Sequence, residues 1–478
     1  MDRVYNIKID KSGDIPLYQQ LSEQITLLIE QGEIKPNEKL PPIRKLAEAL
    51  NVNNVTVVNA YKHLENKKIV YSHVGSGTFV SEIKLSELPE PVLKNQYSAG
   101  FSIDFDIQNA INFAKSTVNP DLFPVNEFKA AFNEVLDRDL GNAFSYQESQ
   151  GYMPLRSEIC KDLLKYNIKT SEDKIQIISG AQQGIDIISK SMLGIGDVVF
   201  VEKPTYYGAL GAFASRGAQI IEIDMQPDGM DMDRLESLLK VMRPKFIYIM
   251  SYFQTPTCYS YCLDKKYRLL NLAAKYDTYI LEEDNQNEFI YNNEDIIPVK
   301  ALDYKNRVMY VKSYSKSIMP GLRIGFMALP KKILNHVLSI KYTTDIATSG
   351  FIQRAFELFL SSGGYDRHIR QMREIFKVRY NTAVKAIDTY LDPYVTYIPP
   401  QGGLNLWLTL KDKTMSSESL SQKLLKENVI ITPGSLYSAE SANTPSFRLS
   451  YAGVDNAYIS LGIRKIATRV NMRKPLSE

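Results

Sequence analysis

Apolar positions in the first eighty residues recur every three or four residues in three runs, which span 15–31, 40–50 and 54–64. Two short apolar segments, 69–71 and 78–80, then flank a Gly-Ser-Gly turn. The spacing of the three runs predicts three short helices, and the flanked turn predicts a β-hairpin. Two short helices joined by a tight turn form a helix-turn-helix, and the hairpin after it is typical of a wing.

From about residue 104, short apolar strands alternate with segments of helical spacing. The predicted strands are 174–178, 197–202, 245–250, 278–281 and 308–311. This alternation predicts an α/β domain with a mainly parallel sheet and helices on both faces. Ligands of such sheets bind beyond the carboxyl ends of the strands, so the residues that follow each strand are the first candidates for a site.

The segment 81–103 between these two patterns has weak periodicity and contains Pro89 and Pro91, which predicts a partly extended linker. We therefore expect domain boundaries at 1–80, 81–103 and 104–478. The last domain is expected to divide into a large part, about 104–370, and a small part, about 371–478.

Composition places the chain among globular proteins of reducing compartments. Of 478 residues, 44% are hydrophobic and 23% are charged. Neither a membrane-spanning apolar run nor a signal-peptide core is visible. The three cysteines form no disulfide framework, so we expect a cytoplasmic protein without membrane contact. A metal is not expected, because Cys258 and Cys262 lack a second pair of ligands.

The N-terminal segment is nearly neutral, with ten Lys or Arg against nine Asp or Glu over residues 1–80. Net charge therefore does not indicate nucleic-acid binding, and any DNA contact must be local. The candidate cations lie in the second half of the segment: Arg44, Lys45, Lys62, Lys67 and Lys68. Helical spacing alone leaves a packing module without DNA contact as an equal alternative.

The run from Pro16 to Val80 resembles the winged helix-turn-helix of the GntR family along its whole length. The matching positions are Leu40-Pro41, Arg44, Leu46-Ala47, Thr56-Val57, Ala60-Tyr61, Leu64 and Gly75 to Val80. By this resemblance Arg44 and Thr56 hold phosphates, the third helix begins with base contacts, and the wing touches the DNA backbone or minor groove. The DNA-contact candidates are Arg44, Asn53, Asn54, Thr56, Asn59, Tyr61, Lys62, Gly75 and Gly77.

Two positions depart from the GntR pattern. Family members usually carry Ser where this chain has Pro42, and often Arg where it has Asn54. Asparagine can pair bidentately with adenine, so the site is expected to be less directed to guanine than is usual in the family.

Three segments of the larger domain carry residues suited to an aldehyde that bears a phosphate. The small residues from Ser179 to Gln182 lead from a strand into a helix, and their amides can cradle a phosphate. Lys316 stands among serines with Arg323 seven residues on, and a lysine near other cations can form a Schiff base with an aldehyde. The acids at 282–284 end a strand, where one carboxylate can meet a pyridine nitrogen. For the segment around Lys316 and Arg323, the alternative is a solvated basic loop without a ligand.

Residues from about 104 to 470 resemble a fold-type I aminotransferase, and their fusion to a GntR segment is similar to the MocR subgroup of transcription regulators. The landmarks occur in the family's order: 120–124, 151–156, 179–183, 204–206, 315–325, 402–403 and 447–449. The resemblance implies an α/β fold-type I aminotransferase-like domain behind a winged helix-turn-helix, with pyridoxal 5'-phosphate (PLP) as cofactor.

Roles carried over from that family give a candidate set of pocket residues. Lys316 would form the internal aldimine, Tyr206 would stack on the ring, and Arg448 would bind the carboxylate of an amino effector or substrate. The cofactor-contact candidates are Gly180, Ala181, Gln182, Tyr206, Glu283, Asn285, Ser313, Ser315, Lys316 and Arg323.

Several of these positions depart from the aminotransferase pattern. Glu283 replaces the Asp that pairs with the pyridine nitrogen, with Asp284 as an alternative partner, and Asn285 replaces the Tyr at the phenolic oxygen. The segment 253–258 and Asn405 also differ from the family. Such changes point away from efficient transamination. Where some relatives carry a second carboxylate-binding Arg, this chain has Gly208, which suggests a ligand without a distal acid.

Three functions are consistent with the sequence. The first is a DNA-binding transcription regulator, expected to be a homodimer, that binds PLP at Lys316 and senses an amino compound or PLP itself. The second is an active PLP-dependent aminotransferase with a vestigial N-terminal domain. The third is a regulator whose larger domain no longer binds PLP and senses another ligand.

Overall fold

The computed structural model describes residues 4–7, 9–10, 16–30, 33–35, 37–67, 69–73, 77–81, 110–292, 295–439 and 444–471. The helices are α1 Leu17–Glu30, α2 Ile43–Ala49, α3 Asn54–Asn66, α4 Val125–Asp139, α5 Met153–Leu163, α6 Ala181–Met192, α7 Tyr207–Ser215, α8 Met232–Val241, α9 Leu263–Lys275, α10 Lys331–Asp345, α11 Gly350–Ser361, α12 Gly364–Tyr390, α13 Ser417–Leu425 and α14 Asn456–Asn471. Short 3₁₀ helices are η1 Val4–Asn6, η4 Pro120–Leu122, η5 Leu140–Phe144, η6 Leu164–Tyr166, η7 Glu172–Lys174, η8 Val299–Leu302, η9 Pro320–Leu322 and η10 Gly434–Tyr437.

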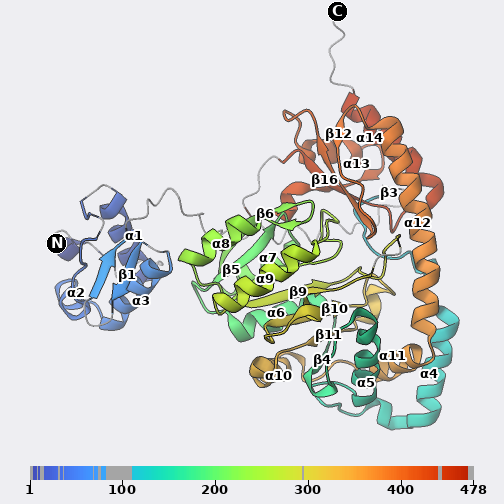
Figure 1. Cartoon of the computed structure of the whole chain (residues 1–478), viewed down its shortest axis with the longest axis horizontal. Helices are drawn as coiled ribbons and strands as arrows, with labels where there is room; N and C mark the ends of the chain where they lie inside the picture. The colour runs from blue at the N-terminus through green and yellow to red at the C-terminus, as the bar shows by residue number, and fades with distance from the viewer. Residues whose placement is uncertain are drawn as a thin grey trace, which may run out of the picture.

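The predicted helix-turn-helix and wing are present in the N-terminal part of the chain (Figure 1). Helices α1, α2 and α3 share one apolar core, and strands β1 Val70–His73 and β2 Gly77–Val80 pair antiparallel. Asn53 ends the turn before α3 as its N-cap, because its side chain accepts a hydrogen bond from the Val55 amide at 3.0 Å.

An eight-stranded sheet forms the centre of the larger domain, in the order β4-β11-β10-β9-β8-β5-β6-β7. Its strands are β4 Ile175–Ile178, β5 Val198–Lys203, β6 Gln219–Gln226, β7 Gly229–Met230, β8 Phe246–Ile249, β9 Tyr279–Asp284, β10 Val308–Ser313 and β11 Gly325–Ala328. All run parallel except β7 and β11. The mainly parallel sheet is thus confirmed, while β6, β7 and β11 were not among the predicted strands.

Helices cover both faces of this sheet because the strand side chains alternate between two apolar cores. Val199 and Val201 of β5 pack with α6, α7 and α10, whereas Val198 and Phe200 pack with α8 and α9. Continuous apolar strands of this kind are expected where a parallel sheet is buried on both faces.

The C-terminal part adds a second, smaller sheet, in the order β12-β13-β16-β15. Its strands are β12 Val395–Thr396, β13 Asn405–Leu410, β15 Thr432–Pro433 and β16 Ser446–Ser450. A separate pair joins β14 Val429–Ile430 to β3 Ile111–Asn112, so the first described strand of the larger domain lies with its last part. Among the helices that the structure describes, none is both long and apolar enough to cross a membrane.

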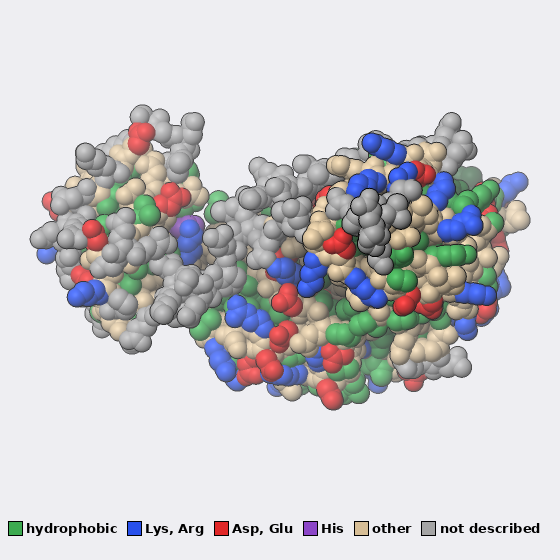
Figure 2. All heavy atoms as spheres, turned by 90° about the horizontal axis from the view of Figure 1, so that it is seen from above, with side chains coloured by type: hydrophobic (Ala, Val, Ile, Leu, Met, Phe, Trp, Pro, Cys, Tyr) green, Lys and Arg blue, Asp and Glu red, His purple; other side chains and the backbone are tan. Residues whose placement is uncertain are grey.

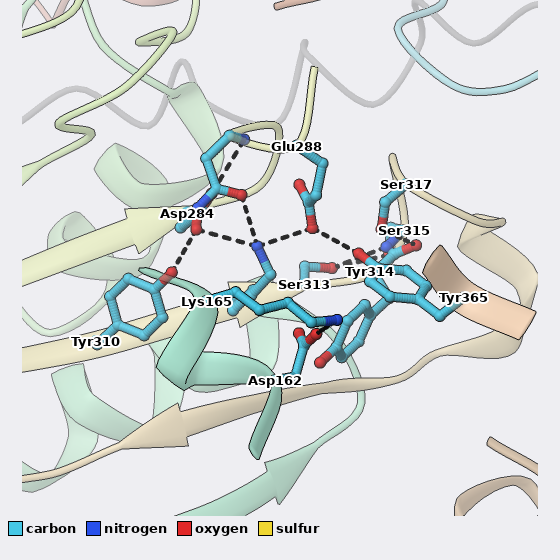
Figure 3. Close-up of polar contacts among 12 residues, drawn as sticks. Asp162, Lys165, Asp284, Glu288, Tyr310, Ser313, Tyr314, Ser315, Ser317 and Tyr365 are labelled. Atoms are coloured by element: carbon cyan, nitrogen blue, oxygen red, sulfur yellow. Dashed lines mark hydrogen bonds and ion pairs between the residues drawn. The ribbon is translucent and has the colours of Figure 1, made fainter. Parts of the chain in front are cut away.

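Strand β9 continues three residues beyond its predicted end and carries all three acids within the sheet. Asp284 faces Lys312 of β10 at 3.0 Å, and Lys312 also pairs with Glu288 at 2.9 Å. The Tyr310 hydroxyl donates to Asp284 and the Tyr365 hydroxyl donates to Glu288 at 2.6 Å (Figure 3). Lys312 thus forms ion pairs with two buried carboxylates. Burial alone would raise the pKa of Glu288, but the charge of Lys312 outweighs this effect and holds the pKa below its usual value.

Removing that cation should destabilise the fold. Lys312 is 1% exposed, so Lys312→Met leaves two buried carboxylates without their counter-charge. We expect the free energy of unfolding in urea to fall by about 3–5 kcal/mol. The exposed Lys332→Met on α10 is the matched control and should change it by less than about 0.5 kcal/mol. Equal effects of the two substitutions would contradict the role given to Lys312.

Candidate functional site

A pocket of about 400 Å³ lies at the carboxyl edge of the large sheet, against the smaller sheet. Its lining residues are Ala114, Ser116, Thr117, Ala181, Gln182, Tyr206, Tyr207, Gly208, Thr255, Glu283, Asn285, Ser313, Ser315, Lys316, Pro320, Arg323, Thr432 and Arg448. Of the predicted pocket residues, only Gly180 is absent from this lining, and it lies next to Ala181 at its edge. Segments far apart in the sequence meet here because parallel strands end at one edge of a sheet.

Lys316 lies in the middle of the pocket, three residues after β10. Its Nζ donates to Asn285 Oδ1 at 3.2 Å and to Thr255 Oγ1 at 3.4 Å. Burial of the amine and, secondly, the charge of Arg448 lower the pKa of Lys316 to about 8. A substantial fraction of this amine is therefore neutral near physiological pH, and a neutral amine is a nucleophile.

Glu283 is the only one of the three acids on β9 that lines the pocket. Its carboxyl group accepts hydrogen bonds from the Tyr248 hydroxyl and from Asn285 Nδ2, the latter at 3.2 Å. Burial raises the pKa of Glu283 above its usual range. Asn285 thus joins the acid and the lysine, because its amide donates to one and accepts from the other.

The alternative that Asp284 replaces Glu283 in the pocket is wrong. Side chains alternate along a strand, so Glu282 and Asp284 point to the face opposite Glu283. Asp284 is held there by Lys312, and Glu282 accepts hydrogen bonds from the backbone amides of Val299 at 2.9 Å and Lys300 at 2.7 Å.

One end of the pocket is built as an anion site. The chain turns at Gly180, with φ +95°, immediately before α6 begins at Ala181. A Cβ at Gly180 would lie 2.7 Å from Arg323 Nη2, so the guanidinium closes directly over the turn and donates to the Ser179 carbonyl. With Ser313 and Ser315 beside it, this end combines a helix N-terminus, a cation and hydroxyls, which together suit a phosphate.

Arg448 lies at the other end, on β16 of the smaller sheet. Its Nη2 donates to the Ala114 carbonyl and to Thr432 Oγ1, the latter at 3.1 Å. The residue is only 6% exposed, and its Nε meets no hydrogen-bond acceptor among the described residues. A buried donor of this kind is completed by a ligand with an acceptor oxygen, such as a carboxylate.

Tyr206 forms a side wall of the pocket at the start of α7. Its ring packs so closely against Gly208 that a Cβ there would lie 2.5 Å from Tyr206 Cζ. Gln182 Nε2 donates to the Gly208 carbonyl at 2.9 Å and joins this wall to the start of α6. The Tyr206 ring thus lines the same pocket as the Lys316 amine and the Glu283 carboxyl group.

Sequence reasoning missed several residues that complete the pocket: Ala114, Ser116, Thr117, Tyr248, Thr255 and Thr432. Thr255 falls in the segment 253–258 that departs from the aminotransferase pattern, and this departure was the only signal for it. Asn405, another departure, is fully buried on the strand next to that of Arg448, with its side-chain amide beside the Cys258 thiol.

The predicted DNA face divides into exposed and buried residues. Arg44, Asn54, Asn59 and Lys62 are exposed and Thr56 is half-buried. Gly77 is exposed at the wing, with φ +112°, while Gly75 lies outside the described residues. Acidic and basic side chains are interspersed over the face of the molecule drawn in Figure 2.

Tyr61 is wrong as a DNA contact. It is buried in the core of the N-terminal part, and its hydroxyl donates to the Pro41 carbonyl at 2.7 Å. Asn53 is exposed but uses its side chain to cap α3. Conversely, Val55 at the start of α3 is 60% exposed, an apolar surface position that the helical pattern did not single out.

Comparison with known proteins agrees with this division of the chain. The family described as "Aminotransferase class I and II" matches residues 109–466, and "Bacterial regulatory proteins, gntR family" matches residues 17–80. The chain is 28% identical to the uncharacterized HTH-type transcriptional regulator YisV of Bacillus subtilis over 96% of each chain.

One further similarity covers nearly the whole chain, and another covers the larger domain. The chain is 24% identical to the probable rhizopine catabolism regulatory protein MocR of Rhizobium meliloti, over 96% of this chain and 94% of that one. The solved structure of a kynurenine aminotransferase from Pyrococcus horikoshii superposes with a TM-score of 0.74 at 30% identity, covering 82% of this chain and 96% of that one. The chain therefore belongs to the class I and II aminotransferase family and carries an N-terminal gntR-family helix-turn-helix domain, as MocR-like regulators do.

Proposed function

We propose that this DNA-binding regulator binds PLP at Lys316 and responds to an amino compound, or to PLP itself, that enters the pocket. One observation carries the proposal: a lysine amine with a lowered pKa lies between an anion site at Arg323 and an unpaired buried donor at Arg448. An aldehyde cofactor with a phosphate fits the first two groups, and a carboxylate fits the third. The proposed boundaries remain 1–80, 81–103 and 104–478, although residues 82–109 lie outside the described part of the chain.

PLP, when bound, supplies an aldehyde for covalent attachment and an electron-withdrawing ring. The residues that would hold its phosphate are Gly180, Ala181, Gln182, Ser313, Ser315 and Arg323. Tyr206 would lie against the ring, Glu283 would face the ring nitrogen, and Asn285 would take the place beside the phenolic oxygen. The tight turn at Gly180 supports this fit, because any side chain there would displace Arg323.

A regulatory role is favoured by what surrounds the lysine. Glu283 is one methylene longer than aspartate and already accepts hydrogen bonds from Tyr248 and Asn285. An amide at position 285 also cannot supply the acidic phenol that the family pattern implies. These features weaken the electron sink that transamination needs and leave covalent binding intact.

Transamination is the second candidate, favoured by the lowered pKa of Lys316, since a lysine that titrates near neutrality can accept and return a proton. A gel shift on the DNA upstream of the gene, combined with turnover of common amino donors, separates the two functions. A protein that turns over amino donors but does not shift the DNA would support the aminotransferase function.

The proposed homodimer is supported by an exposed apolar surface around η5. Leu140, Phe144 and Tyr146 are 68%, 66% and 90% exposed, around η5 and the loop after it. Large apolar side chains gathered in this way commonly mark a protein interface. A symmetric pair would also bring two helix-turn-helix units to two half-sites on DNA. The DNA-binding role itself favours a cytoplasmic location.

Covalent PLP binding has a direct spectroscopic test. Purified protein mixed with PLP should develop an absorbance band at roughly 380–430 nm, as lysine-bound PLP does. We expect Lys316→Ala to lose this band, because Nζ is the attachment atom. Lys332→Ala, exposed on α10, should keep it. A Lys316→Ala protein with the unchanged band would exclude Lys316 as the attachment site.

The rate of PLP incorporation should depend on pH through Lys316. Only the neutral amine attacks an aldehyde, so the rate should rise with pH and level off above about 8, where Lys316 has lost its proton. Arg448→Met removes a charge that lowers this pKa, and the rise should therefore move to higher pH. Stopped-flow absorbance from about pH 6 to about pH 10 measures both curves, given the ordinary lysine pKa near 10.4. Arg464→Met, exposed on α14, should leave the curve unchanged. If Arg464→Met shifted the curve as much as Arg448→Met, the electrostatic coupling between Arg448 and Lys316 would be refuted.

DNA contacts of two kinds should be separable by gel shift on the upstream region. Asn54→Ala should weaken binding about 5- to 100-fold at sites with adenine opposite it and relax the base preference there. Arg44→Ala should weaken binding to all sequences and reduce the salt dependence by about one counterion. Tyr61→Phe should leave DNA affinity unchanged, since its hydroxyl bonds to Pro41 inside the core. Loss of binding by a folded Tyr61→Phe protein would contradict this assignment.

A further inference from the structure

We propose that the effector is an amino compound with one carboxylate and an otherwise uncharged side chain, and that the pocket rejects a second acid. This inference rests on the proposed function, since it concerns the end of the pocket left over after PLP is bound. It is carried by the charges that line the pocket and by the way Gly208 is enclosed.

Among the described lining residues, the pocket has three cations: Lys316, Arg323 and Arg448. Arg323 lies over the turn at Gly180 and Lys316 lies beside Asn285, so both belong to the part that fits PLP. Arg448 is the cation that remains for the effector. A single guanidinium, with its Nη2 already used by Ala114 and Thr432, pairs with one carboxylate through its remaining donors.

The surface beside Arg448 is polar but uncharged. Ser116 and Thr117 line the pocket after Ala114, whose carbonyl holds the guanidinium, and Thr432 lies on the neighbouring strand. Lys115, between Ala114 and Ser116, is not among the lining residues and lies near Gly453. Hydroxyl groups of this kind can donate to an amide or hydroxyl oxygen of a ligand. They cannot neutralise a carboxylate that has lost its water, and an unpaired charge in such a site costs several kcal/mol.

Position 208 is closed to a second cation. A Cβ there would lie 2.3 Å from Gln182 Oε1 and 2.5 Å from Tyr206 Cζ. The Gly208 carbonyl also accepts the hydrogen bond from Gln182 that joins α7 to the start of α6. A long basic side chain at this position would displace both the aromatic wall and the glutamine, so glycine here is tied to the arrangement of the wall. Among the described residues that line the pocket, the effector end thus has no cation besides Arg448, and position 208 could supply one only by displacing this wall.

Pairs of amino acids that differ only in charge test the inference. PLP-loaded full-length protein is titrated with L-glutamine and L-glutamate, and separately with L-asparagine and L-aspartate. The readouts are the change in the PLP absorbance band and the thermal unfolding midpoint. We expect the neutral member of each pair to bind at least about tenfold more tightly. Equal or tighter binding of the acidic member would overturn the inference, as would an absence of response to both neutral amino acids.

A charge added at the effector end provides the converse test. Ser116→Lys should raise the affinity for L-glutamate relative to L-glutamine by about tenfold, because it supplies the missing counter-charge. Ser460→Lys adds the same charge on the exposed face of α14 and should leave the ratio unchanged. An unchanged ratio in a Ser116→Lys protein that retains the PLP band would count against the inference. A wild-type protein that takes up no PLP refutes the proposed function itself, and this separates the two failures.

Discussion

Lys312 and Asp284 face each other across β10 and β9, and this buried ion pair holds together the two strands on which the pocket depends. The same register places Glu283 opposite Val311, on the pocket face, and Lys316 follows Val311 by five residues. Glu288 shares the cation from the loop that follows β9. Because a buried cation with two carboxylates has few alternative arrangements, it specifies how the acid and the nucleophile of the pocket lie relative to each other.

The pocket holds three cations in different surroundings. An anion site closed by Arg323 lies at one end, a lysine with a lowered pKa lies in the middle, and Arg448 lies at the other end with a donor still unpaired. Burial lowers the pKa of Lys316 and raises the pKa of Glu283, because it disfavours the charged form of each. Asn285 connects them through one amide group. The site therefore brings an anion-binding turn, a lysine with a lowered pKa and a buried acid together in one pocket.

The gntR-family part has little net charge, so any contact with DNA depends on a few exposed side chains. Its core is a small apolar cluster shared by three helices and a hairpin, and the exposed start of α3 carries Asn54, Val55 and Asn59. Neutral amides and a valine can read base edges and a thymine methyl group, while nearby cations such as Arg44 can pair with phosphates. Regulation then requires an effector that binds two arrangements of the protein with different affinity.

Periodicity and motif order were enough to predict much of this protein. Helical spacing located α1, α2 and α3, apolar runs located five strands of the large sheet, and the residues after those strands included Lys316 and Arg323. Such patterns succeed because they reflect local geometry: the period of an element, and the edge at which parallel strands end. Tertiary structure decided the rest. Only packing shows that Tyr61 bonds to Pro41 inside a core, that Lys312 is the partner of Asp284, and that Thr255 reaches Lys316. Each of these depends on a partner distant in sequence, and no local pattern encodes which side chain will meet another across the fold.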